Sequence, residues 1–164
     1  MPELTRTTAI GQPDPARRSG RVAAVLAAAA LVLETPVLVW WLVGDMTTTP
    51  SDPDYLIHPP HVDAATETAM GLVSLGIWVA ALVVFVIACR GARLQRGWWL
   101  VLGSLLTAGA IVGWGERGVT MGVVGANIGG GIVLYAGTPI VVGLVGFAAV
   151  VAAKQLWAGR SEPD

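Results

Sequence analysis

Residues 70–89 read MGLVSLGIWVAALVVFVIAC, a stretch that contains no charged residue. A bilayer core about 30 Å thick is crossed by about 20 apolar residues of α-helix, at about 1.5 Å of rise per residue. This stretch therefore has the length and the composition of a membrane span, and it decides the fold class of the chain.

Three other segments have the same character. The first apolar segment is interrupted only by Glu34, Thr35 and Pro36. We therefore predict an all-α fold, a polytopic transmembrane four-helix bundle. Its spans are expected at about 22–43, 70–89, 98–114 and 132–153.

A glycine-rich stretch, residues 119–131, precedes the last predicted span. Together with that span it is too long for one straight crossing of a bilayer. We therefore expect it to be an interfacial or re-entrant segment, with irregular backbone that is covered by protein or water.

The overall composition agrees with a membrane domain. Hydrophobic residues make up 54% of the 164 residues and charged residues only 13%, about half the usual charged share of a soluble domain. We expect a membrane domain at 21–157 with an extracytoplasmic loop at 44–69. Residues 1–20, which are polar and contain several prolines, are predicted to be a disordered cytoplasmic tail, and residues 158–164 a second cytoplasmic tail.

The positions of the basic residues predict the orientation. Every lysine and arginine except Arg117 falls on one side of the four-span arrangement, which should be the cytoplasmic side. Arginine outnumbers lysine in a chain rich in Ala, Gly and Val, a bias typical of high-GC bacterial genomes. We therefore expect a bacterial inner (cell) membrane protein with both termini in the cytoplasm. The basic residues on that side are Arg6, Arg17, Arg18, Arg21, Arg90, Arg93, Arg96, Lys154 and Arg160.

Small residues predict how the spans associate. In lipid, helices pack closely where glycine or alanine lets their backbones approach. Gly109 and Gly113 form a G-x-x-x-G pair in the third span, and Gly137 and Gly143 lie in the fourth. We expect these four glycines to pack helices together, either within the chain or between copies of it.

Glu34 is the most informative polar residue, because a charge near the middle of a span costs at least about 2.5–3.5 kcal/mol. Pro36 removes a backbone donor close by, and Thr35 can compensate for it. Glu34, Thr35 and Pro36 are therefore candidates for a proton or cation site. The alternative is a structural Glu34 that bonds to another span. The expected partner in either case is Ser104, Thr107 or Thr138.

Other polar residues are expected to lie outside the membrane. We expect Glu116 and Arg117 at the outer end of the third span to face solvent or headgroups. The alternative is that they pair with other groups, and a buried pair of Arg117 with Glu34 would need Arg117 to lie deep in the membrane. His58, His61 and Asp63 in the outer loop have ligand types suited to Zn²⁺ or Cu²⁺, but their spacing does not define three or four convergent ligands. We therefore predict no metal and treat these three residues as weak candidates.

The chain shows no constellation of catalytic residues and predicts no cofactor. The glycine-rich stretch lacks the strand and lysine of a nucleotide-binding loop, and the net charge of −1 does not favour nucleic acid. We expect a non-catalytic accessory or scaffold protein rather than an enzyme. Its expected partners are the lipid bilayer and either other membrane proteins or copies of itself. The alternative is an oligomeric small-solute or proton-coupled transporter that uses Glu34.

Overall fold

The computed structural model describes residues 15–48, 53–59, 61–91, 95–123 and 126–158. Each of its four helices is long and apolar enough to cross a membrane, with spans of 25 to 31 residues. This confirms the predicted all-α fold and makes the chain a multi-pass membrane protein. The helices are α1 (Pro15–Val43), α2 (Ala64–Gly91), α3 (Arg96–Thr120) and α4 (Ala126–Ala158).

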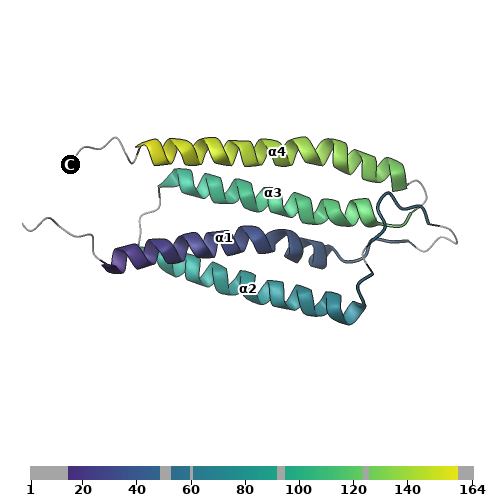
Figure 1. Ribbon diagram of the computed structural model, residues 1–164, viewed down its shortest axis with the longest axis horizontal. Coiled ribbons are helices and arrows are strands. Elements are labelled where there is room, and N and C mark those ends of the chain that lie inside the picture. Colours follow the sequence, from purple (N-terminus) through teal and green to yellow (C-terminus); the bar gives the residue numbers. More distant parts are fainter. Residues whose placement is uncertain (1–14, 49–52, 60, 92–94, 124–125, 159–164) are drawn as a thin grey trace, which may run out of the picture.

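The helices lie side by side in the order α2, α1, α3, α4 (Figure 1). Helix α1 packs against both α2 and α3, whereas the backbone of α4 packs against α3 alone. The bundle is therefore open, and α2 and α4 form its two edges. Helices α1 and α3 run in one direction and α2 and α4 in the other, so α1 begins and α4 ends at the same end of the molecule (Figure 1).

The core lies where α1, α2 and α3 meet. Leu31 is its most deeply buried large side chain, with 1% of its surface exposed. Alanines fill much of the remaining core, which lets the helices approach closely. On α2 and α3 it is completed by Ala81, Phe85 and Leu102.

The loop between α1 and α2 crosses one end of the bundle and contacts the connection between α3 and α4 (Figure 1). The N–H of Ile57 donates to the carbonyl of Val119 (3.2 Å), and the N–H of Val123 donates to the carbonyl of Asp54 (3.3 Å). These bonds satisfy backbone groups at the end of α3 that the helix leaves unpaired. The loop between α1 and α2 is thus bonded to the end of α3 and to the residues that follow it.

Two segments differ from the sequence prediction. Most of residues 119–131 is helical: α3 continues to Thr120 and α4 begins at Ala126. A helix pairs its backbone groups internally, so it needs no covering protein or water at that depth. Residues 15–20, predicted as part of the disordered tail, form the start of α1. Proline is favourable at a first helical position such as that of Pro15, because its missing N–H would be unpaired there anyway. The rest of the predicted tails, residues 1–14 and 159–164, lies outside the described residues.

Candidate functional site

The middle of α1 keeps its helical path through Pro36. Proline has no N–H, so the carbonyl four residues earlier loses its usual donor. In the preceding turn, the Thr35 hydroxyl donates to the carbonyl of Leu31 (2.6 Å). Threonine therefore adds a side-chain bond to the helix where proline weakens the backbone pattern.

Thr35 and Pro36 are covered by the neighbouring helices. The indole N–H of Trp78 on α2 donates to Thr35 Oγ1 (3.1 Å). On the other side, Gly109 and Gly113 of α3 lie against Pro36, so closely that a Cβ at Gly113 would overlap the Pro36 carbonyl oxygen. The two residues thus anchor α1 between α2 and α3.

Glu34 differs from its two neighbours. Its backbone carbonyl accepts a hydrogen bond from the Ser74 hydroxyl of α2 (3.4 Å), but its carboxyl group forms no hydrogen bond or ion pair with any described residue. Of the expected partners, Thr107 bonds to the carbonyl of Gly103 instead (2.9 Å). Among Glu34, Thr35 and Pro36, only Glu34 keeps a polar group available for another molecule.

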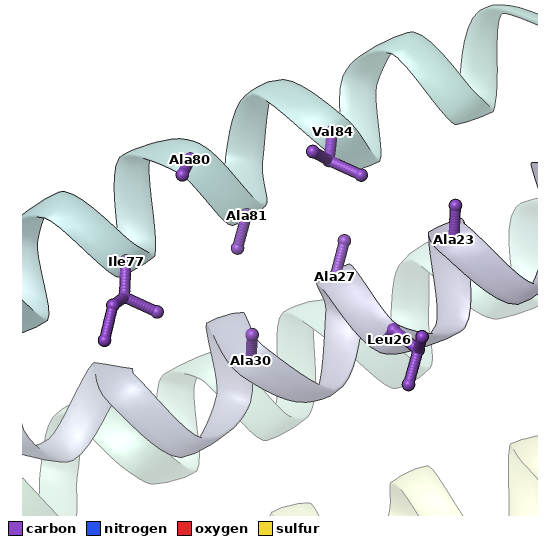
Figure 2. Close-up of a pocket in the computed structure, with 8 residues that line it drawn as sticks. All are labelled: Ala23, Leu26, Ala27, Ala30, Ile77, Ala80, Ala81 and Val84. Atoms are coloured by element: carbon purple, nitrogen blue, oxygen red, sulfur yellow. The ribbon is translucent and has the colours of Figure 1, made fainter.

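A groove of about 450 Å³ lies between α1 and α2 (Figure 2). Glu34 follows Ala30 by one helical turn and therefore continues the same face of α1. The residues that line the groove are all apolar, and helical spacing places Glu34 one turn beyond its Ala30 end. Its lining residues are Ala23, Leu26, Ala27, Ala30, Ile77, Ala80, Ala81 and Val84.

A second polar cluster lies around Arg117, at the end of the bundle where α1 ends and α2 begins. Only 8% of Arg117 is exposed. Its guanidinium forms an ion pair with Glu67 of α2, Nε donates to the carbonyl of Trp40 (2.9 Å), and Cζ lies 3.8 Å from the centroid of a Trp40 ring. The expectation that Arg117 faces solvent is therefore wrong, because three groups from α1 and α2 replace water around it.

The Asp45 carboxylate, near this cluster, also accepts a hydrogen bond, from the N–H of Thr47 (2.8 Å). Hydrogen bonds from Thr47 lower the pKa of the Asp45 carboxyl, and the charge of Arg117 lowers it further to a smaller extent. Sequence reasoning missed the Arg117–Glu67 pair because it placed Glu67 in the loop, whereas α2 begins before it at Ala64. Two features could have indicated the pair: Arg117 is the single basic residue outside the set predicted to be cytoplasmic, and Glu67 lies only three residues before the second predicted span.

Two of the three weak metal candidates have other contacts in the structure. The Asp63 carboxylate caps α2 by accepting hydrogen bonds from the N–H groups of Ala65 (3.1 Å) and Thr66 (2.9 Å). The ring of His58 lies beside that of Tyr55, with centroids 5.1 Å apart. In the part of the chain that the structure describes, no three His, Cys, Asp or Glu side chains lie close enough to hold one metal ion, and this includes the surroundings of His61.

The four glycines chosen for helix packing have different surroundings. Gly109 and Gly113 lie against α1, and a Cβ at Gly137 would lie 3.9 Å from Ile111 of α3. Gly143 has nothing within 4 Å of the position a Cβ would take. Gly143 thus lies on a face of α4 that the chain itself leaves uncovered.

Comparisons of the chain with protein-family models, with curated proteins and with solved structures give no match. Its function is therefore inferred from the geometry alone.

Proposed function

We propose that this protein is a non-catalytic accessory or scaffold component of a membrane, which acts by helix–helix contacts with other membrane proteins or with copies of itself. The observation that carries the proposal is the open layer of helices. A closed bundle would use both faces of each span internally, whereas here α2 and α4 each have a side without a neighbouring helix.

The edge helices have surfaces suited to such contacts. Only 6% of the most apolar window of α4 and 17% of that of α2 is buried within the chain. Gly143 and Gly146 on α4, and Gly76 on α2, have nothing within 4 Å of where a Cβ would lie. Open glycines on a lipid-facing helix let a second helix approach closely.

The polar side chains support a structural rather than a catalytic role. Arg117, Glu67, Thr35 and Asp63 are all engaged in bonds that hold helices together or cap them. We place the protein in a bacterial inner membrane with both termini in the cytoplasm, which the distribution of basic residues supports.

The experiment is extraction from native membranes directly into polymer-bounded nanodiscs, followed by measurement of the protein mass in each disc. We expect a protein mass well above that of the 17.0 kDa chain. Leucine at Gly143 and Gly146 should reduce the larger species. As a control, leucine at Gly103, an open glycine of α3, which is not an edge helix, should leave it unchanged. Discs that hold a single chain and nothing else would contradict the proposal.

A second candidate is an oligomeric transporter of small solutes or protons. It is favoured by the Glu34 carboxyl group, which bonds to none of the described residues inside the span. Proteoliposomes should then show a flux that Glu34→Gln abolishes, with Glu116→Gln as the control. A flux that Glu34→Gln leaves unchanged would remove Glu34 from the mechanism.

A further inference from the structure

Several polar side chains within the spans, Ser104 of α3 among them, have no hydrogen-bond partner among the described residues. Two of them lie on helices that do not contact each other: the Glu34 carboxyl on α1 and the Thr138 hydroxyl on α4. The other threonines in the described helices all use their hydroxyl groups, as Thr35, Thr107 and Thr120 do. An unpaired polar group in hydrocarbon is costly. Both groups therefore favour contact with a polar partner outside the chain.

Glu34 and Thr138 lie at nearly the same depth in the layer. Gly137, next to Thr138, faces Ile111 of α3. Ile111 lies midway between Gly109 and Gly113, which both face Pro36. Because neighbouring residues of a helix differ by only about 1.5 Å in height, Glu34 and Thr138 are level to within about one helical turn.

The two groups cannot meet within one chain. Helix α3 lies between α1 and α4, and α1 and α4 do not touch (Figure 1). Glu34 lies on the side of α1 that faces α2, since Ser74 of α2 bonds to its carbonyl. A contact between Glu34 and Thr138 therefore requires a second copy of the chain.

The residues around these two groups match in register. Starting from Thr138, exposed residues of α4 recur at steps of four, three and four toward the inner end. Counting back from Glu34 by the same steps toward the start of α1 gives Ala30, Ala27 and Ala23, which all line the groove. Because α1 and α4 run in opposite directions (Figure 1), a second copy with the same membrane orientation brings the two rows into step. The facing pairs are then Glu34 with Thr138, Ala30 with Val142, Ala27 with Val145 and Ala23 with Ala149.

The shapes of the two rows are complementary. The α1 row is alanine, and it forms one wall of the 450 Å³ groove, with Ile77, Ala80, Ala81 and Val84 of α2 opposite (Figure 2). Val142 and Val145 on α4 are 64% and 46% exposed. Branched side chains facing small ones fill a groove and permit the close packing that drives helix association in lipid.

We propose that α4 of one copy binds in the groove between α1 and α2 of a second copy, with the Thr138 hydroxyl donating a hydrogen bond to the Glu34 carboxyl. This inference rests on the proposed function and deepens it, because it names a second copy of the chain as the partner of the α4 edge.

The test uses disulfide cross-linking in native membranes, in a background where Cys89 is replaced by serine. Ala30→Cys and Val142→Cys are made on separate chains and expressed together. A disulfide requires Cα atoms about 4.4–6.8 Å apart, so the mixed pair should form a covalent dimer. Ala29→Cys, the neighbouring alanine on a different side of α1, is the matched control and should not cross-link to Val142→Cys.

The polar pair is tested in the same cross-linking assay. Thr138→Val should lower the cross-linked fraction severalfold, while Thr138→Ser, which keeps the hydroxyl, should preserve it. An unchanged fraction in Thr138→Val would overturn the hydrogen bond to Glu34. Circular dichroism of each variant confirms that the helices have formed.

Two results would overturn the contact itself. One is cross-linking of Val142→Cys chains with each other but not with Ala30→Cys, which would show α4 paired with α4. The other is the absence of any mixed dimer. If the larger nanodisc species persists in either case, the proposed scaffold role stands with a different partner, so the two failures are distinguishable.

Discussion

Replacing Gly113 by alanine is expected to weaken the packing of α1 on α3. A Cβ at this position would overlap the Pro36 carbonyl oxygen and lie 3.0 Å and 3.1 Å from the carbonyl carbon and Cα of Pro36. These are backbone atoms of a helix, so they cannot rotate away as the end of a side chain can. The helices must separate locally to admit the methyl group.

Two other glycines of α3 set the scale. At Gly109 the nearest atom to an added Cβ is Pro36 Cδ at 3.3 Å, a tight contact that a shift of a few tenths of an ångström relieves, and at Gly103 nothing lies within 4 Å. Extra carbon in a well-packed site costs about 1–3 kcal/mol, while alanine in place of glycine stabilises a helix by about 0.5–1 kcal/mol. Gly113→Ala should therefore lose about 1–2 kcal/mol, Gly109→Ala should be near neutral, and Gly103→Ala should gain up to about 1 kcal/mol.

The assay is reversible unfolding of each variant by sodium dodecyl sulfate in mixed micelles, followed by tryptophan fluorescence and circular dichroism. The reasoning predicts an order of stability in which Gly103→Ala exceeds Gly109→Ala and Gly113→Ala is lowest. Equal stability of Gly113→Ala and Gly103→Ala would refute the close approach of α1 and α3 at Pro36.

Three further predictions concern polar contacts. Glu67→Gln should reduce the free energy of unfolding by about 1–3 kcal/mol, less than the loss of a fully buried pair because Glu67 is partly exposed; a double-mutant cycle with Arg117→Met should recover part of it. Thr35→Val removes the acceptor of the Trp78 indole and should cost about 1–3 kcal/mol; a cost that stays the same in a Trp78→Phe background would contradict this. The bonds from Thr66 hold the pKa of Asp63 below its ordinary value of 3.8, so the stability that Asp63 contributes is fully present above pH 3.8 and is lost as the pH falls through the lowered value. The difference between the wild type and Asp63→Ala in helix unfolding should therefore be constant from pH 7 to pH 5 and disappear in strong acid.

Much of the fold could be predicted because the bilayer imposes a length. An uncharged run such as residues 70–89 must be helical if it lies in hydrocarbon, since no other single segment satisfies its own backbone there. The prediction was less good where a segment is rich in glycine. Residues 126–131 were expected to be irregular, yet they belong to α4, because the internal bonding of the helix outweighs the low helix propensity of glycine.

The candidate site could be predicted only in part. Glu34 is conspicuous in the sequence, but its separation from Thr35 is not. The structure shows that Thr35 is turned to the core and bonded to Trp78, while the Glu34 carboxyl bonds to no described residue. Trp78 lies in the middle of the predicted span 70–89, but its partner depends on which faces of α1 and α2 meet.

By itself, the sequence determined the solvent of this protein and the number of its crossings, because apolar length and the exclusion of charge from hydrocarbon are properties of each segment alone. Only the tertiary structure decided the order of the helices in the layer and the burial of Arg117 against Glu67 and Trp40. It also decided that Glu34 and Thr138 lie at similar depth on two helices that do not contact each other. These depend on contacts between residues distant in the chain. Several packings of nearly equally apolar helices bury similar surface in lipid, so small residues and a few polar bonds select among them.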